Sequence, residues 1–203
     1  MEFSNKKIFI FDYDGTIADT SKSHERAFQK VLSHLELKFD YSKIAGLKTY
    51  DAIKNCLIEN NLKLKDEEIF FLVKEKQKIF KQIIKEKIEP ISGADELIKW
   101  AYLKYHLSIA SSGSKDNVLM GIKLLGLFNY FDDIICSEDV VNSKPYPDIF
   151  NKVISITKFK KNEALIFEDS DNGIVSAQRA NIDYLDIREN SFKDLLSVFK
   201  NGS

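Results

Sequence analysis

Residues 8–16 read Ile8-Phe9-Ile10-Phe11-Asp12-Tyr13-Asp14-Gly15-Thr16, and this stretch decides the fold. Four consecutive apolar residues predict a buried strand of a parallel sheet, because a strand with one wet face would alternate apolar and polar side chains. Gly15 favours a turn directly after the strand. We therefore expect Asp12 and Asp14 at the carboxyl end of the strand, where open α/β sheets bind ligands. Two carboxylates this close repel each other unless a cation neutralises them or one keeps its proton.

Strands and helices alternate along the chain from residue 90 onward. Further apolar runs predict strands over 107–110, 133–136, 164–167 and 184–187. Helices are expected over 94–105, from about 115 to 125, after Pro147, over 173–180 and over 192–199. Such alternation predicts an α/β fold with a Rossmann-like parallel sheet that carries helices on both faces.

A block with only helical patterns separates the first strand from this alternating part. Helices are predicted over 23–35 and 50–60, and a third carries an apolar stripe between residues 69 and 84. An all-helical block between two halves of an α/β pattern indicates an inserted cap. We therefore expect a core domain of residues 1–17 and 90–203, and a helical cap domain of residues 18–89.

The composition is that of an ordinary globular protein. The 203 residues are 44% hydrophobic and 30% charged, which suits one domain with a modest insertion. With 30 basic and 31 acidic residues the formal net charge is −1, so no overall attraction to nucleic acid or to anionic membranes is expected. The lysine-rich run from Lys74 to Lys87 keeps helical period and contains Glu75 and Glu86, which favours the solvated outer face of an amphipathic helix.

Membrane and redox signals are missing from the sequence. No apolar run approaches the roughly 20 residues that span a bilayer, and residues 1–7 lack the apolar core of a secretion signal. Cys56 and Cys136 match no metal or redox spacing, so we expect two buried free thiols. These features predict a cytoplasmic protein that does not bind membranes.

Three further polar clusters lie at the ends of predicted strands or before a helix, and their order along the chain resembles the motif order of a known family. Ser111-Ser112-Gly113-Ser114 follows one predicted strand, Lys144-Pro145-Tyr146-Pro147 precedes a helix, and Glu168-Asp169 follows another strand. With Asp12-x-Asp14-Gly15-Thr16 in front, these clusters resemble, in order, the four motifs of the haloacid dehalogenase (HAD) superfamily of phosphotransferases. The helical block resembles the small cap of the branch that contains β-phosphoglucomutase and phosphoglycolate phosphatase.

The resemblance implies a role in phosphoryl transfer for each cluster. That reaction needs an in-line nucleophile, a proton donor for the leaving oxygen, and positive charge around the phosphoryl group. Asp12 is the candidate nucleophile because carboxylates form aspartyl-phosphate intermediates, and Asp14 is the candidate general acid and base. Lys144 would lie between the nucleophile and the phosphate.

The second motif would bind the phosphoryl oxygens. The resemblance assigns this to the hydroxyl of Ser112, and the backbone N–H groups of Gly113 and Ser114 would help because a turn that enters a helix presents donors to anions. A shift of one residue would choose Ser111 instead, and this alternative stays open.

Acidic oxygen ligands favour Mg²⁺ as the cofactor. The resemblance implies that the ligands are the Asp12 carboxylate, the Asp14 backbone carbonyl and the Asp169 carboxylate. Glu168 is either a further ligand or a residue that supports the ligands.

Two positions in the helical block are substrate candidates. His24 stands where β-phosphoglucomutase has a hinge-side histidine that couples cap closure to chemistry; a packing or surface role is the alternative, as expected for His34 and His106. Thr49 stands where the mutase has an arginine for a distal phosphate, with Lys48 beside it. Lysine lacks the bidentate fork of arginine, so Lys48 is either a weaker substrate ligand or a solvated residue.

We therefore predict a Mg²⁺-dependent phosphatase that hydrolyses a small phosphorylated metabolite, either a sugar phosphate or a phosphoglycolate-like monoester, through an aspartyl-phosphate intermediate. A β-phosphoglucomutase, which moves a phosphoryl group between C1 and C6 of a sugar, is an alternative. A non-catalytic phospho-receiver or Mg²⁺-binding module is an alternative of another class, which Asp14 disfavours. We expect a monomer. Substrate choice would depend on cap residues between about 40 and 90, whose sequence shows only apolar helices.

Overall fold

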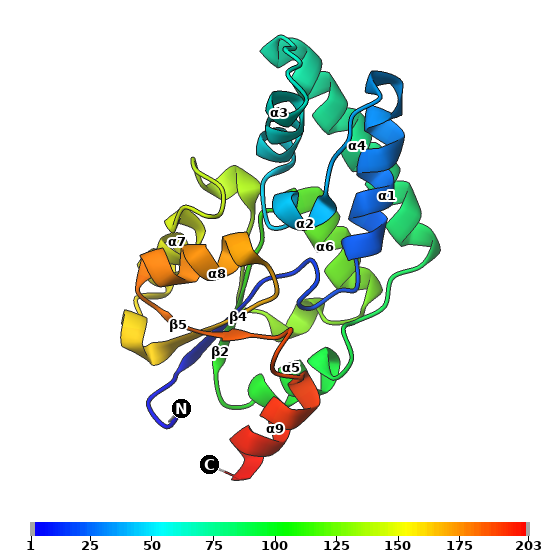
Figure 1. Ribbon diagram of the computed structural model, residues 1–203. Helices are drawn as coiled ribbons and strands as arrows, with labels where there is room; N and C mark the ends of the chain where they lie inside the picture. The colour runs from blue at the N-terminus through cyan, green and yellow to red at the C-terminus, as the bar shows by residue number, and fades with distance from the viewer. Residues whose placement is uncertain (1–2, 202–203) are drawn as a thin grey trace.

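The computed structural model describes residues 3–201 and contains a parallel sheet with a group of helices at one end (Figure 1). Within these residues five strands form one sheet in the order β3-β2-β1-β4-β5, and all neighbouring strands are parallel. The strands are β1 (Ile8–Phe11), β2 (His106–Ala110), β3 (Asp133–Ile135), β4 (Ala164–Glu168) and β5 (Asp183–Asp186). The predicted parallel sheet is confirmed, and its central strand is the wholly apolar β1.

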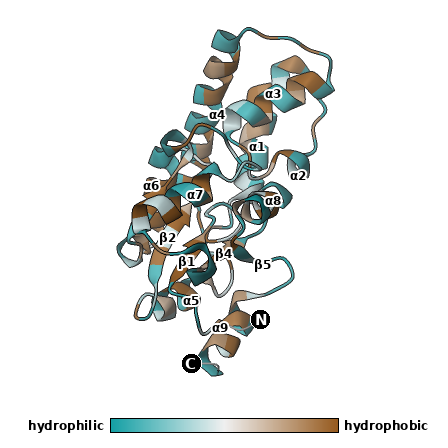
Figure 2. Ribbon diagram, turned by 90° about the vertical axis from the view of Figure 1, so that its left-hand side faces the viewer, coloured by the Kyte–Doolittle hydropathy of each residue, from teal (hydrophilic) through white to brown (hydrophobic). Residues whose placement is uncertain are grey.

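Helices cover both faces of the sheet, because alternate residues of each strand point to opposite sides. The core helices are α5 (Ala94–Ala101), α6 (Lys115–Leu124), α7 (Asp148–Thr157), α8 (Asp171–Ala180) and α9 (Phe192–Asn201). Phe9 and Phe11 pack with α5, α6 and α9, whereas Ile8 and Ile10 pack with α7 and α8. Figure 2 shows the resulting concentration of hydrophobic residues in the strands and on the inner sides of the helices.

The chain between β1 and α5 is helical and has an apolar cluster of its own. Its helices are α1 (Ser21–Leu32), α2 (Tyr41–Ile44), α3 (Thr49–Glu59) and α4 (Asp66–Glu86). Phe28, Ile53 and Leu72 belong to this separate cluster. These helices lie beyond the carboxyl ends of the strands (Figure 1). The position agrees with an inserted helical block, and its limits at residues 18 and 89 stay a prediction.

Several element boundaries differ from those predicted, for local reasons. Helix α1 begins at Ser21 rather than at residue 23, and α5 ends at Ala101 rather than at residue 105. Helix α2 was not predicted because four residues are too few to show a helical period. Helix α8 begins before Gly173, because the Ser170 hydroxyl accepts the Gly173 N–H at 3.0 Å and caps the helix. Short 3₁₀ turns occur at Ser33–Leu35, Phe128–Tyr130, Ser137–Asp139 and Lys161–Glu163.

The interpretation of the lysine run as a solvated face is right for Lys74 and Lys78 but wrong for Lys76. Lys76 is only 2% exposed, whereas its two neighbours in the run are exposed. Leu72 and Phe80, one helical turn before and after it, are also buried. Lys76 therefore belongs to the inner stripe of α4, where an apolar residue would be expected.

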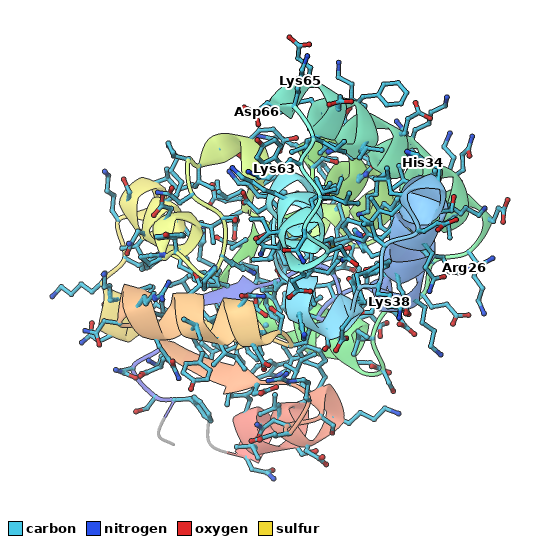
Figure 3. All side chains as sticks on the ribbon, turned by 45° about the horizontal axis from the view of Figure 1, so that its top comes forward. Arg26, His34, Lys38, Lys63, Lys65 and Asp66 are labelled. Atoms are coloured by element: carbon cyan, nitrogen blue, oxygen red, sulfur yellow. The ribbon has the colours of Figure 1, made fainter. Side chains whose placement is uncertain are left out.

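The expectations for the two cysteines and for His34 and His106 are confirmed. Cys56 and Cys136 are buried free thiols. His34 is exposed near the outer edge of the helical block (Figure 3), and His106 is partly buried with its ring 2.6 Å from the Asp133 carboxylate. Among residues 3–201, no helix combines the length and the apolar character needed to cross a bilayer.

Candidate active site

The carboxyl ends of the central strands bring the predicted motifs together. Phe11 pairs in register with Ile109 of β2 and Phe167 of β4, so the polar residues that follow these three strands lie side by side. Asp12, Ser112 and Asp169 line one cavity together with Asp14. This cavity also touches the helical block, since His24 and Lys76 form part of its wall.

Lys144 joins the site from the loop before α7, and it is buried against two carboxylates. Its ammonium donates to Asp12 Oδ1 at 2.6 Å and to the Glu168 carboxylate. Burial alone would lower the pKa of Lys144, but the two carboxylates outweigh burial and raise it, so this side chain stays charged. Burial raises the pKa of Asp12 well above its ordinary value, and Lys144 opposes that shift. The site therefore holds a fixed positive charge beside the carboxyl group of the candidate nucleophile.

Glu168 has no exposed surface, and protein donors occupy both of its oxygens. One oxygen accepts from Lys144, and the other accepts from the N–H of Asp169 at 2.9 Å and from the N–H and hydroxyl of Ser170 at 3.0 and 3.1 Å. A Cβ on Gly173 would overlap this carboxylate, so the chain needs glycine there. This arrangement favours Glu168 as the residue that holds Lys144 and the turn before α8 in place.

Asp14 receives two hydrogen bonds from α1 and the residue before it. The Thr20 hydroxyl donates at 2.7 Å to the same oxygen, Oδ1, that lies 2.9 Å from His24 Nε2. Thr20 stands at the N-cap position of α1, but its side chain contacts Asp14 instead of capping the helix. Burial alone would raise the pKa of the Asp14 carboxyl; His24 and Thr20 outweigh burial and hold it below the ordinary value.

Lys76 extends this contact into the helical block. Its ammonium lies 2.5 Å from His24 Nδ1 and over the rings of Phe28 and Phe80, at 4.5 and 5.0 Å from their centroids. Because Nδ1 accepts from Lys76, the neutral ring carries its proton on Nε2 and donates it to Asp14. Burial, and Lys76 as well, lower the pKa of His24, while burial lowers the pKa of Lys76 to about 7.

His24 was predicted from the sequence as a site residue, but its partner Lys76 was not. The signal that would have found Lys76 is its spacing: Leu72, Lys76 and Phe80 recur every four residues, so the lysine lies in line with the apolar stripe of α4. A charged residue at such a position has to find a buried partner.

The two candidate serines of the second motif differ in their contacts. The Ser112 hydroxyl is buried, lines the cavity and has no hydrogen-bond partner in the described part of the chain. The Ser111 hydroxyl accepts the N–H of Gly113 at 2.9 Å. The contacts therefore favour Ser112 as the hydroxyl that is free for a ligand, with Ser111 shaping the turn. Gly113 also lines the cavity, and Ser114 stands at the N-cap of α6.

An acidic cluster at the same strand ends can hold a metal ion. Carboxylate oxygens of Asp12, Glu168 and Asp169 lie within 4.8 Å of one another. The Thr16 hydroxyl donates to Asp169 at 2.9 Å and orients it. Burial and the neighbouring Glu168 raise the pKa of Asp169 to about 7. An all-oxygen donor set whose charges repel one another fits a hard divalent cation such as Mg²⁺.

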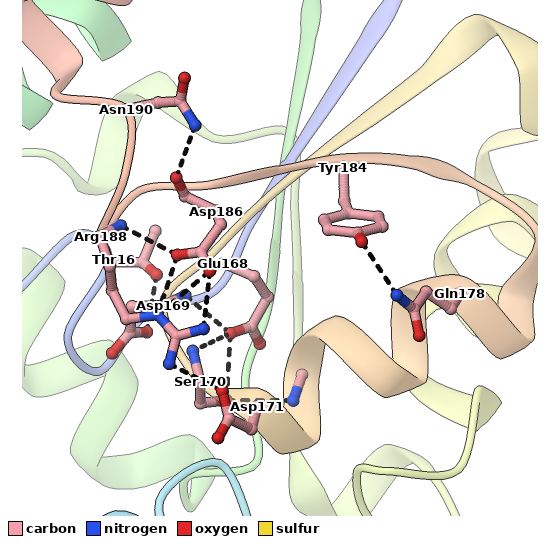
Figure 4. A network of polar contacts seen from close by, with 11 residues as sticks. Thr16, Glu168, Asp169, Ser170, Asp171, Gln178, Tyr184, Asp186, Arg188 and Asn190 are labelled. Atoms are coloured by element: carbon pink, nitrogen blue, oxygen red, sulfur yellow. Dashed lines mark hydrogen bonds and ion pairs between the residues drawn. The ribbon is translucent and has the colours of Figure 1, made fainter.

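Next to this cluster, Arg188 links the end of β5 to the start of α8 through two ion pairs. The Arg188 guanidinium lies 2.6 Å from Asp186 and 2.8 Å from Asp171, and Figure 4 shows this bridge beside Asp169 and Glu168. It connects the strand end to the first turn of α8, so it supports the segment that carries the acidic pair.

Lys48 does not line the cavity. Its ammonium donates to the backbone carbonyls of Val140 at 2.7 Å and Val141 at 3.0 Å, and so links the helical block to the loop after β3. Thr49, the next residue, does line the cavity. A substrate contact of Lys48 stays a prediction, and the structure gives this side chain a different partner.

This fold and this arrangement of aspartates, lysine and hydroxyl define a class of hydrolases that act at the carboxyl edge of a Rossmann-like sheet. The chain belongs to the haloacid dehalogenase-like hydrolase family, whose model matches residues 9–187. The predicted superfamily and the predicted enzyme class, a phosphoric monoester hydrolase, are confirmed.

Named relatives cover nearly the whole chain. Fructose-1-phosphate phosphatase YqaB of Escherichia coli is 29% identical, and the alignment covers 88% of this chain and 95% of the length of YqaB. A phosphorylated carbohydrates phosphatase of Thermotoga maritima is 27% identical, over 86% of this chain and 81% of its own. The structure of a β-phosphoglucomutase from Clostridium difficile superposes with a TM-score of 0.81 at 22% identity, over 97% of this chain and 98% of that one, which shows the shared fold.

Proposed function

We propose that the protein is a Mg²⁺-dependent phosphatase that hydrolyses a small phosphorylated metabolite, of the sugar monophosphate class, through a phosphorylated Asp12. The observation that carries this proposal is the ion pair between Lys144 and Asp12, the latter lining one cavity together with Asp14. The names of two relatives, which describe phosphatases of fructose 1-phosphate and of phosphorylated carbohydrates, support the substrate class.

In the first half-reaction a carboxylate oxygen of Asp12 attacks phosphorus, and the bond from phosphorus to the ester oxygen breaks. Protonated Asp14 gives its proton to the departing oxygen, which leaves as an alcohol. Asp14 is ionised in the free site, and the negative charge of an arriving phosphate favours its protonated form. Lys144 and the Ser112 hydroxyl bind oxygens of the transferring group.

In the second half-reaction Asp14 acts as the base. It removes a proton from water, whose oxygen attacks phosphorus and releases Asp12 and inorganic phosphate. The hydrogen bonds from His24 and Thr20 hold the Asp14 carboxylate in position for both steps. A second acid placed in this way favours turnover over long-lived storage of the phosphoryl group, and so disfavours the receiver alternative.

The residues that would hold Mg²⁺ are Asp12 and Asp169 through their carboxylates, with the Asp14 carbonyl as the resemblance implies. When bound, the cation would neutralise charge on the phosphoryl oxygens. Glu168 would support this site indirectly, because its oxygens already accept from protein donors.

Substrate entry would require the helical block to move. The space inside the cavity that water can fill is about 40 Å³, whereas one water needs at least about 10–15 Å³. A sugar phosphate is far larger than the few waters that fit. The structure therefore corresponds to a closed arrangement, which would exclude bulk water during the first half-reaction.

The test is phosphate release from a panel of metabolite monophosphates, with and without Mg²⁺, by the wild type and by Asp12→Asn and Asp14→Asn. We expect release that depends on Mg²⁺ and is lost in both variants. Equal release by the wild type and Asp12→Asn would refute the mechanism. Conversion of β-glucose 1-phosphate to glucose 6-phosphate with little free phosphate would show that the protein is a β-phosphoglucomutase instead. A long-lived phosphorylated Asp12 would show that it is a phospho-receiver.

A further inference from the structure

The loop that carries Lys144 is held from one side by helix α8. The Tyr146 carbonyl accepts from the Ser176 hydroxyl at 2.7 Å, and the Pro145 carbonyl accepts from the Arg179 guanidinium at 3.0 Å. The guanidinium also lies over the Tyr146 ring, 5.8 Å from its centroid. Ser176 and Arg179 are three residues apart on α8, so both side chains project from one face of the helix.

The composition of this loop explains why its carbonyl groups are the points of attachment. Pro145 and Pro147 have no N–H, so the loop can donate few backbone hydrogen bonds. The Tyr146 N–H is already used within the loop, where it donates to the Ser143 carbonyl at 2.9 Å. The carbonyls of Pro145 and Tyr146 remain as groups through which another element can fix the loop.

Ser176 is a polar residue at a wholly buried place in α8. Its side chain has no exposed surface, and its neighbours Ala177 and Ala180 are also buried. A buried hydroxyl costs free energy unless it is hydrogen-bonded, and a serine inside a helix can bond the carbonyl of its own preceding turn. The Ser176 hydroxyl donates to the lysine loop instead. Alanine would avoid the cost of burial on this face, so the contact with the loop accounts for the serine.

Helix α8 also begins at the turn that holds the acidic cluster. Asp169 and Ser170 directly precede the helix, and Ser170 caps it. Lys144 has to meet Asp12 and Glu168 at the strand ends, although its side chain is long and flexible. Because α8 contacts the lysine loop and the acidic turn together, it fixes one relative to the other.

These contacts lie within the core and do not need the helical block. The opposite end of the same loop does contact that block, where the Ser143 hydroxyl donates to Asp51 at 2.5 Å. Movement of the block for substrate entry would break the Ser143 contact and leave the two α8 contacts in place. Ser176 and Arg179 would therefore hold Lys144 in open and closed arrangements alike.

We propose that Ser176 and Arg179 are positioning residues for the reaction, which keep Lys144 beside Asp12 by fixing the carbonyls of the lysine loop. The inference rests on the proposed phosphatase function, in which Lys144 binds the transferring group. Loss of either contact should let the loop shift away from the strand ends. A displacement of about 1 Å in a catalytic group can lower a rate by about 100-fold.

Competitive acetylation with acetic anhydride, followed by peptide mass spectrometry, measures the protection of each lysine amine. In the wild type we expect Lys144, which is 1% exposed, to react much more slowly than the exposed Lys78. Ser176→Ala and Arg179→Ala should each raise the acetylation rate of Lys144 by about threefold or more, because the loop opens more often. Lys6 is buried at the amino end of the sheet, so its rate should not change unless the whole protein loosens.

Phosphate release in the presence of Mg²⁺ tests the link to the reaction. We expect kcat to fall by about fivefold or more in Ser176→Ala and in Arg179→Ala, and further in the double variant. Ser197→Ala is the matched control, because its hydroxyl also donates to a backbone carbonyl, that of Lys193 at 3.1 Å, but within α9. This control should keep the wild-type kcat and the wild-type protection of Lys144.

Thermal unfolding checks that each variant is folded. Arg179 is exposed, so Arg179→Ala carries the test if Ser176→Ala does not fold. Unchanged protection of Lys144 in the folded variants, or an increase that Lys6 shares, would overturn the positioning role. Increased acetylation of Lys144 with unchanged kcat would overturn the link to the reaction.

Failure of the proposed function would give a different result. A wild type that releases no phosphate from the panel would overturn the phosphatase and, with it, the role of these two residues in the reaction. The acetylation rates would still show whether α8 holds the lysine loop.

Discussion

The Lys76 ammonium lies 2.5 Å from Nδ1 of His24, so a buried cation of α4 contacts a partly buried ring of α1. Through the other ring nitrogen the contact reaches Asp14 at 2.9 Å. This chain of three side chains links α4, through α1, to one of the predicted catalytic acids. Burying a lysine costs stability, so its presence in the stripe of α4 points to a role in the site.

Replacement of Lys76 by methionine should stabilise the protein. The pKa of Lys76 falls from 10.5 to about 7 on folding, so the unfolded chain binds more protons between pH 7 and 10.5, and stability rises with pH across that window. The penalty is fully present below pH 7. We expect Lys76→Met to raise the free energy of unfolding by about 2–4 kcal/mol at pH 6.5, with a smaller gain at pH 9.5.

Urea unfolding at both pH values measures this gain. Lys78→Met is the control, because Lys78 lies on the same helix but is exposed, and its effect should stay within about 0.5 kcal/mol. A loss of stability in Lys76→Met at pH 6.5, or a gain that does not change with pH, would contradict the prediction.

Alanine at Gly15 should disrupt the acidic cluster, whereas alanine at Gly126 should only strain the backbone. Both glycines have positive φ, +89° and +70°, so both substitutions carry a strain of about 1–2 kcal/mol. A Cβ on Gly15 would overlap the Asp169 carboxylate, while a Cβ on Gly126 meets nothing within 4 Å. We expect Gly15→Ala to lose activity and at least 1 kcal/mol more stability than Gly126→Ala. Denaturant unfolding and phosphate release measure the two effects. If Gly15→Ala and Gly126→Ala lost the same free energy of unfolding and the same activity, the overlap with Asp169 would be refuted.

Lys144 and Glu168 should be strongly coupled in a double-mutant cycle. Lys144→Met leaves buried carboxylates without their cation, and we expect a loss of about 3–5 kcal/mol. Glu168→Gln added to that variant removes one of these charges, so the double variant should lose less than the sum, by about 1–3 kcal/mol. The exposed pair Lys7–Glu163, 2.7 Å apart, serves as the reference, and its coupling should be below about 1 kcal/mol. Similar coupling energies for both pairs would show that burial does not strengthen the Lys144 contact.

Stabilisation by Mg²⁺ should increase with pH between about 5.5 and 8. Folding raises the pKa of Asp169 to about 7, so without metal the folded state binds more protons than the unfolded chain from about pH 4 to 7, and this group lowers stability as pH rises through that window. Mg²⁺ needs the deprotonated carboxylate, so its binding competes with the proton.

The rise in Tm on addition of Mg²⁺ should therefore be larger at pH 8 than at pH 5.5. It should be absent in Asp169→Asn and retained in Asp116→Asn, whose carboxyl is exposed in the first turn of α6. An equal rise in Tm at both pH values, or a rise that survives in Asp169→Asn, would place the metal elsewhere.

Much of the fold and the core of the site follow from the sequence, because they depend on local patterns. A wholly apolar run predicts a central strand such as β1, and turn residues predict where each strand ends. Parallel strands then bring Asp12, Ser112 and Asp169 to one edge whatever the details of packing. For the same reason the helical block was recognisable, while the four-residue α2, which has no period to detect, was not.

Contacts between distant segments were decided only by the tertiary structure. The sequence predicted that Lys76 belongs to a solvated face, like the other lysines of its run. Only the packing of α4 on α1 shows that it is buried against His24. In the same way, packing directs Lys48 to the carbonyls of Val140 and Val141, and the Ser176 hydroxyl to the carbonyl of Tyr146. The sequence by itself determined the strand ends and their chemistry, because these depend on neighbours along the chain. The three-dimensional packing decided which charges are buried and which pair, because those energies depend on groups that are far apart in sequence.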